Sequence, residues 1–153
     1  MKTTVQKIKL RPDQRLIVVS DIHGNMDYLV QLLRKVDYSG DDVLVIVGDL
    51  VDKGVDSLRT LQYVMELSRK NEVYVTIGNV DLHRVQFLTD TDEEADSRFC
   101  KYTHLLQLWW GGGLLSDMFR ELGIPLDKLT PETAGEYRAL LRDHFHEEIA
   151  FLE

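Results

Sequence analysis

The sequence predicts an α/β fold built on a parallel β-sheet, and two patterns indicate it. Three short runs rich in Val and Ile, at 15–20, 43–47 and 73–77, are mostly apolar, and 43–47 is apolar throughout, which is typical of strands buried in a parallel sheet. Between them, 26–36 and 57–70 repeat apolar residues at helical spacing. This β-α-β-α-β order predicts helices that cover the sheet on both faces.

The first two strand–helix units have clear expected boundaries. The first strand ends at Ser20, and a turn at 39–42 separates the first helix from the second strand. Asp56 or Ser57 is the expected N-cap of the second helix. The apolar positions are Met26, Leu29, Val30, Leu33 and Val36 in the first helix, and Leu58, Leu61, Val64, Met65 and Leu67 in the second.

The pattern changes after Asp81. A further helix is expected over 82–88, and the acidic stretch 89–96 is expected to be a loop. The rest is predicted to be mainly helical, with breaks at the glycines 111–113 and at Gly123-Ile124-Pro125. Thr130 as N-cap and Pro131 at the first helical position predict a last long helix, which runs to about His144.

Composition narrows the class of protein. A chain of 153 residues with a single cysteine, Cys100, predicts one domain in a reducing compartment. The net charge of −8 argues against broad nucleic-acid binding, which needs a basic surface. No apolar run approaches the roughly 20 residues of a membrane span, and the N-terminus lacks a signal peptide. The composition therefore predicts a cytoplasmic protein without a membrane partner.

Each predicted strand is followed directly by a short polar motif. These motifs are Asp21-Ile22-His23-Gly24-Asn25, the stretch from Gly48 to Gly54, and Gly78-Asn79-Val80-Asp81. Sites in parallel sheets form beyond the carboxyl ends of the strands, so the three motifs are expected to converge. One such motif is weak evidence, because Asp and Gly also end strands as turn formers. Three in order are much stronger.

The residue types in the motifs suit metal and phosphate chemistry. Asp21, His23 and Asp49 form a ligand set for Mn, Fe or Zn. Asp49 could bridge to a second metal about 3.5–4 Å away, for which Asn79 offers an amide oxygen. Lys53 places positive charge near a bound phosphate. Asp52 and Asp81 are candidate catalytic residues that could orient or charge-balance neighbouring groups.

Together the motifs resemble the signature of the calcineurin-like metallophosphoesterase superfamily, which is Asp-x-His-Gly, Gly-Asp-x-x-Asp-Arg-Gly and Gly-Asn-His-Asp/Glu. The chain looks most like the phosphoprotein-phosphatase branch, which includes bacterial serine/threonine phosphatases and symmetrical diadenosine tetraphosphatases. The stretch 109–113, Trp-Trp-Gly-Gly-Gly, resembles a Trp-x-x-Asn-Gly-Gly stretch of bacterial members. The resemblance implies the N-terminal half of an α/β/β/α sandwich, a single but incomplete domain over 1–153. Residues 1–88 would be its metal-binding βαβαβ core, and 89–153 a helical insert.

The resemblance also implies a function. It is that of a metal-dependent phosphoester hydrolase, similar to serine/threonine phosphatases, in which two divalent ions activate a water. Asp21, His23 and Asp49 match ligands of the first metal, and Asp49 and Asn79 match two ligands of the second. Lys53 stands in the place of a phosphate-binding arginine, and Asn79 also faces the phosphate. The implied substrates are phosphorylated proteins, small phosphate esters or dinucleoside polyphosphates.

Two departures from the family pattern leave alternatives open. Val80 replaces a histidine that is thought to protonate the leaving group. Two further histidines that complete the second metal site are missing, and His83, His104, His144 and His146 are expected to be surface residues. The chain could therefore be an active hydrolase, a catalytically impaired domain that binds metal, phosphate or a partner, or a truncated product.

The missing half of the sandwich leads to a further expectation. An apolar surface left uncovered could support oligomerisation, whereas ordinary packing within the helical segment is the competing expectation. The residues in question are Trp109, Trp110, Leu114, Leu115 and Phe119.

Overall fold

The computed structural model describes residues 5–153 and confirms the α/β architecture. The first part of the chain alternates strands and helices as expected. In order these are β1 (Leu16–Ser20), α1 (Met26–Lys35), β2 (Val43–Val47), α2 (Ser57–Lys70) and β3 (Val73–Thr76). The three strands are parallel in the order β1-β2-β3, with Ile17 opposite Leu44 and Leu44 opposite Val73.

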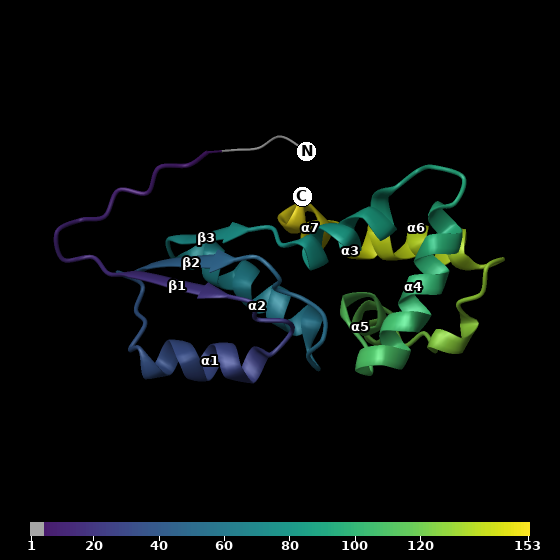
Figure 1. Ribbon diagram of the computed structural model, residues 1–153, viewed down its shortest axis with the longest axis horizontal. Helices are drawn as coiled ribbons and strands as arrows, with labels where there is room; N and C mark the ends of the chain where they lie inside the picture. The colour runs from purple at the N-terminus through teal and green to yellow at the C-terminus, as the bar shows by residue number, and fades with distance from the viewer. Residues whose placement is uncertain (1–4) are drawn as a thin grey trace.

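The remainder of the described chain is helical. It comprises α3 (Asn79–Thr89), α4 (Ala95–Trp110), α5 (Leu114–Glu121), the 3₁₀ turn η1 (Leu126–Lys128), α6 (Ala134–His144) and α7 (His146–Leu152). Helices α4, α5 and α6 lie beyond the carboxyl ends of the strands, while α1 and α2 lie alongside the sheet (Figure 1). The helical segment therefore closes the end of the sheet at which the three motifs were expected.

The sheet is packed against helices on one face only. Leu44 and Ile46 of β2 are completely buried in the core, together with apolar residues of α1 and α2. On the opposite face Leu16, Val18 and Val47 are 45, 58 and 45% exposed. The expectation of helices on both faces is therefore wrong, because two crossovers of the same hand in a sheet of order β1-β2-β3 place α1 and α2 on the same face.

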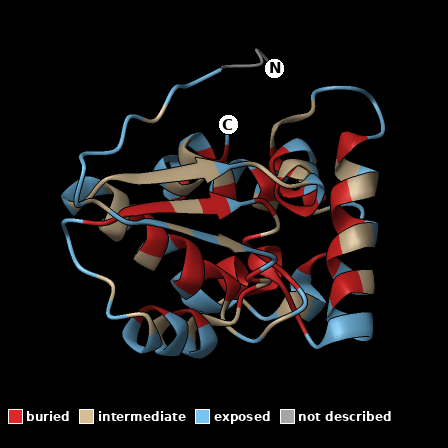
Figure 2. Ribbon diagram, turned by 60° about the vertical axis from the view of Figure 1, so that its left-hand side comes forward, coloured by how far each residue is buried: buried red, intermediate tan, exposed pale blue. Residues whose placement is uncertain are grey.

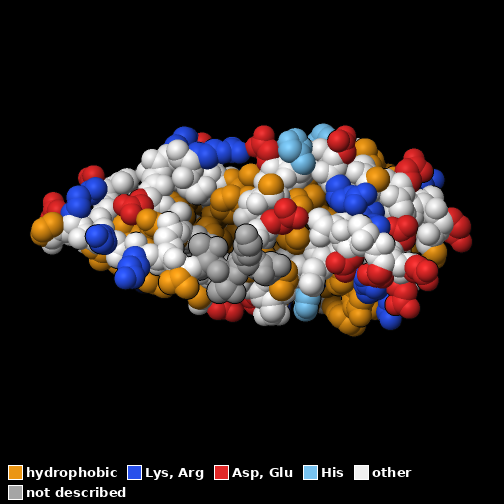
Figure 3. Space-filling model, turned by 90° about the horizontal axis from the view of Figure 1, so that it is seen from above, with side chains coloured by type: hydrophobic (Ala, Val, Ile, Leu, Met, Phe, Trp, Pro, Cys, Tyr) orange, Lys and Arg blue, Asp and Glu red, His pale blue; other side chains and the backbone are white. Residues whose placement is uncertain are grey.

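The figures show the same asymmetry. In Figure 2, β2 is largely red, whereas the neighbouring β1 is pale blue and tan. Seen from above, the molecule is elongated and carries apolar side chains near its middle, with charged side chains spread toward the ends (Figure 3).

The start of α2 differs from the expected capping. Asp56 is the N-cap residue, but its side chain makes no capping hydrogen bond and lies 3.5 Å from Arg59. Instead the carboxylate of Asp117, on α5, accepts the Leu58 N–H at 3.2 Å. Burial raises the pKa of Asp117, and the hydrogen bond from Leu58 partly offsets that effect. A residue far along the chain thus caps this helix.

The last long helix begins later than expected, at Ala134 and not at Pro131. The hydroxyl of Thr133 accepts the Thr130 N–H at 2.9 Å and donates to the Lys128 carbonyl at 2.8 Å. These bonds hold 130–133 in a turn, so Thr130 does not cap the helix. The breaks at the glycines 111–113 and at Gly123 are confirmed.

The apolar residues singled out after Gly113 belong to the core. Leu114, Leu115 and Phe119 are each 1% exposed, so ordinary packing accounts for them and they form no outer surface. Trp109 and Trp110 remain exposed. Between residues 5 and 153, every helix is too short or too polar to cross a bilayer.

Candidate metal centre

Backbone hydrogen bonds hold the first two motifs side by side beyond the ends of β1 and β2. The N–H groups of Asp21, His23 and Gly24 donate to the carbonyls of Gly48, Asp49 and Leu50 at 3.3, 2.9 and 2.8 Å. These bonds continue the pairing of the two strands past the sheet. The Asp-x-His motif and Asp49 therefore enter the same small space.

The polar residues of these loops adopt a left-handed backbone conformation. Asp21, His23, Asp49, Asp52 and Lys53 have φ values of 54, 50, 49, 65 and 63°. For residues other than glycine this conformation costs on the order of 1–3 kcal/mol each, and it concentrates at functional sites. The loops thus hold five candidate site residues in costly geometry that the surrounding hydrogen bonds maintain.

Two glycines allow the loops to approach this closely. A Cβ atom on Gly54 would overlap the His23 carbonyl, and one on Gly78 would overlap the backbone and carboxylate of Asp49. Gly54 therefore brings the second motif onto the first, and Gly78 brings the end of β3 onto the second. All three strand ends depend on these contacts.

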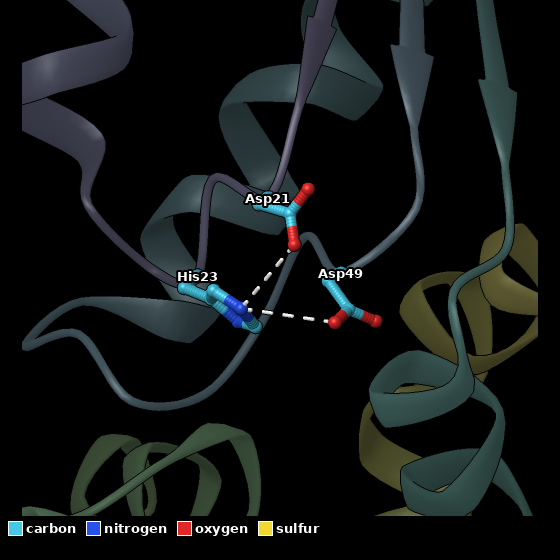
Figure 4. A group of neighbouring side chains, drawn as sticks. All are labelled: Asp21, His23 and Asp49. Carbon is cyan, nitrogen blue, oxygen red and sulfur yellow. Dashed lines mark ion pairs between the residues drawn. The ribbon is translucent and has the colours of Figure 1, made fainter.

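Asp21, His23 and Asp49 point toward one another, and their ligand atoms all lie within 4.8 Å (Figure 4). His23 Nε2 is 3.8 Å from Asp21 Oδ1 and 3.7 Å from Asp49 Oδ2. His23 Nδ1 lies 3.3 Å from the Val51 carbonyl, which can only accept, so the proton sits on Nδ1. Nε2 is then the nitrogen whose lone pair could bind a metal, and the donor set fits a divalent ion such as Mn, Fe or Zn.

The third motif supports this group through its backbone. The Val80 N–H, at the start of α3, donates to Asp49 Oδ1 at 3.2 Å and so orients the carboxylate. Asn79 is the first residue of α3, and its side chain is exposed beside that contact. The Val80 side chain is buried and carries no proton-transfer group.

Residues 14–143 of the chain match the sequence model of the calcineurin-like phosphoesterases. The chain belongs to this family.

Individual relatives share the N-terminal part. A symmetrical bis(5'-nucleosyl)-tetraphosphatase of Shigella dysenteriae serotype 1 is 41% identical over 73 residues, which is 47% of this chain and 25% of that protein. One from Salmonella paratyphi B is 43% identical over 67 residues, 43% of this chain and 23% of that protein. The matched region thus spans about a quarter of the length of these relatives. A solved structure of a candidate diadenosine tetraphosphatase, 30% identical, covers 58% of this chain and 43% of that one with a TM-score of 0.47.

The family is divalent-metal dependent. In this chain more ligands are gathered for one ion than for a second. Within residues 5–153 the group of three is the one cluster of at least three His, Cys, Asp or Glu ligands. His104 Nε2 contacts the Leu129 carbonyl at 2.8 Å, and His83, His144 and His146 are exposed. The described residues therefore bring together the three ligands expected for the first ion, and the roles of Asp49 and Asn79 toward a second stay predictions.

Lys53, which stands in the place of the family's arginine, reaches the metal group. Its Nζ lies 2.9 Å from His23 Nε2 and donates to the lone pair on that nitrogen. Lysine keeps the charge of arginine but not its two-pronged hydrogen bonding. Positive charge therefore stands beside the three ligands.

Asp81 is used to build the loops. One of its oxygens accepts the N–H groups of Leu50 and Val51 at 2.9 and 3.1 Å, and the other accepts that of Gly78 at 2.9 Å. Burial raises its pKa, and these three bonds partly counter that effect. Its carboxylate ties the second motif to the third, and a catalytic role for it stays a prediction.

Asp52 lies in a buried ion pair that sequence reasoning missed. Its carboxylate is completely buried, accepts Nε–H of Arg84, and also accepts the Leu114 N–H at 2.8 Å. Arg84 lies on α3, one helical turn after Val80, and is the charged partner of Asp52. No local sequence signal indicates this pair, because the two residues are 32 positions apart. A catalytic role for Asp52 also stays a prediction.

We expect Asp21→Ala to weaken Mn²⁺ binding by more than about 100-fold, because removal of residues that merely support a ligand already costs about 10–100-fold. Isothermal titration of the metal-free protein would measure it. Asp37→Ala is the matched control, since Asp37 is also a left-handed aspartate, with φ of 50°, but lies outside the group. Equal losses in both variants would contradict the assignment.

We expect Lys53→Gly to be more stable than Lys53→Ala by about 1 kcal/mol, because glycine adopts the left-handed conformation without the Cβ penalty. Both variants lose the ammonium group, so the difference between their free energies of unfolding reports only the effect of the backbone conformation. Urea unfolding measures it. Equal stabilities would show that φ at position 53 carries no such cost.

We expect Arg84→Met to lower the free energy of unfolding by about 3–5 kcal/mol, because it leaves the Asp52 carboxylate buried without a charged partner. Arg69→Met is the control, since its ion pair with Glu147 is exposed and worth about 1 kcal/mol or less. The double variant Asp52→Asn/Arg84→Met should regain part of the loss. If Arg84→Met matched the control, the buried pair would have no structural role.

Proposed function

We propose that the chain is the metal-binding part of a phosphoester hydrolase whose preferred substrates contain phosphoanhydrides, with dinucleoside polyphosphates as the leading class. The proposal rests on one observation, the convergence of Asp21, His23 and Asp49 in left-handed turns at the ends of adjacent parallel strands. The symmetrical tetraphosphatases among the relatives support the substrate class.

The roles of the chain's own residues follow from their positions. Asp21, His23 and Asp49 would hold the first ion, and Asp49 and Asn79 would contribute to a second. When bound, the metal polarises a phosphoryl oxygen and lowers the pKa of a water. Lys53 Nζ lies 2.9 Å from the His23 nitrogen that would hold the metal, so its ammonium would stand beside a phosphate bound there. The Val80 N–H keeps Asp49 oriented.

Val80 favours anhydrides over phosphoserine. A phosphoserine ester leaves as a basic alkoxide, which needs a proton donor, and general acid catalysis is typically worth about 10²–10⁴-fold. An anhydride leaves as a weakly basic phosphate oxyanion and needs that donor far less. The protein phosphatase activity expected from the family branch is therefore the less favoured form of this function.

A second candidate is a domain that binds metal and phosphate without turnover. The absence of a proton donor at Val80 and the pairing of Asp52 with Arg84 favour it. Metal binding with no hydrolysis of any phosphate ester or anhydride would support this alternative.

We expect the chain with Mn²⁺ to hydrolyse diadenosine tetraphosphate and p-nitrophenyl phosphate, and a phosphoserine peptide far more slowly. Val80→His should raise phosphoserine hydrolysis by up to about 10²–10⁴-fold and anhydride hydrolysis much less, since only the alkoxide needs the added proton. Nucleotide products separated by chromatography measure the hydrolysis of diadenosine tetraphosphate, p-nitrophenol absorbance measures that of the aryl ester, and release of inorganic phosphate measures that of the peptide.

Asp49→Asn is the control and should bring all rates to the background without protein. Hydrolysis that survives this substitution would contradict the metal mechanism. Equal gains for ester and anhydride in Val80→His would contradict the argument from the leaving group.

A further inference from the structure

Two exposed tryptophans lie side by side at the end of α4. Trp109 and Trp110 are 59 and 39% exposed, and their rings meet edge to face with centroids 6.4 Å apart. Gly111, with φ of 73°, ends the helix directly after them. Large aromatic side chains are usually mostly buried, so an adjacent pair left in solvent marks a candidate binding surface.

The pair lies next to the metal group. Lys53 Nζ is 6.0 Å from the centre of the Trp110 ring and 2.9 Å from His23 Nε2. The Lys53 side chain thus lies between the metal ligands and the Trp110 ring. In a nucleotide the ribose separates the base from the phosphate, and this separation is of the same order as that between the Trp110 ring and the metal ligands.

A buried contact joins the segment after α4 to the loop that carries Lys53. Asp52 precedes Lys53, and its carboxylate accepts the N–H of Leu114 at 2.8 Å, just after the glycines that follow Trp110. Asp52 is itself held by Arg84. The loop with Lys53 and the residues that follow α4 are therefore joined through the core.

We propose that Trp110 is a stacking platform for the nucleobase of a nucleotide whose phosphate lies at Lys53 and the metal ligands. Trp109 supports the ring edge to face. Stacking on an indole accepts every base, because each base has a π face. The inference rests on the proposed function and deepens it, since it gives a reason for a nucleoside, and not a bare phosphate, in the substrate.

The test uses adenosine 5′-monophosphate and ribose 5-phosphate, which differ by the base. The chain has two tryptophans, so its indole emission reports on this pair alone. With Mn²⁺ present, the adenosine nucleotide should quench the emission in a saturable way and ribose 5-phosphate should not. By calorimetry, Trp110→Ala should weaken nucleotide binding by about 5- to 150-fold, the equivalent of losing one stacked base.

Two further variants serve as references. Trp110→Phe keeps an aromatic face and should retain most of the affinity. Tyr28→Ala removes an exposed aromatic residue from a different helix, α1, and should bind like the unmodified chain. Thermal unfolding of Trp110→Ala checks that the variant is folded, and Trp110→Phe tests the stacking if it is not.

The outcomes separate this inference from the hydrolase itself. Base-dependent binding without hydrolysis would support the platform and count against the proposed function. Equal affinity for the two probes would overturn the platform even if hydrolysis is observed. A loss of ribose 5-phosphate binding as large as that of the nucleotide in Trp110→Ala would mark the ring as a support for the phosphate site, and would also overturn it.

Discussion

The site depends on the backbone pairing that continues beyond the ends of β1 and β2. Three N–H groups of 21–24 donate to carbonyls of 48–50, and without these bonds the Asp-x-His motif and Asp49 would be separate surface loops. Residues in the left-handed conformation lie on both sides of this pairing. The geometry needed to gather three ligands thus comes from an extension of the sheet, with Gly54 and Gly78 as the condition for close approach.

The buried carboxylates around the site are stabilised in different ways. Asp81 is satisfied by three backbone N–H groups, whereas Asp52 is neutralised by Arg84. Asp49 shares one oxygen with the Val80 N–H and turns the other to His23. Because the buried charges are already paired, the negative charge that is open to a cation is concentrated at Asp21 and Asp49. Lys53 stands at the edge of that charge.

Local sequence signals predicted the parts that local forces determine. Unbroken apolar runs located all three strands, and β2 and α2 have the predicted bounds. The single-sided sheet was not predictable in this way, since Leu16 and Leu44 are equally apolar and only tertiary packing distinguishes them. The start of α6 at Ala134 was missed because the Thr133 hydroxyl accepts the Thr130 N–H, which holds these residues in a turn and prevents Thr130 from capping the helix. Arg84 was missed because its partner is distant in sequence and its burial depends on the packing of α3.

The cap of α2 has a consequence for how the site assembles during synthesis. The Leu58 N–H cannot form its hydrogen bond until Asp117 is available, and Asp117 leaves the ribosome only after most of the helical segment has been made. Until then the Leu58 N–H in the first turn of α2 is open to water, while the Asp56 N–H can already donate to the Gly24 carbonyl. The strands can pair early, but the loop with Lys53 is completed when α5 docks. A metal ion that reaches a nascent chain therefore meets the ligands of the first two motifs before it meets the finished phosphate side of the site.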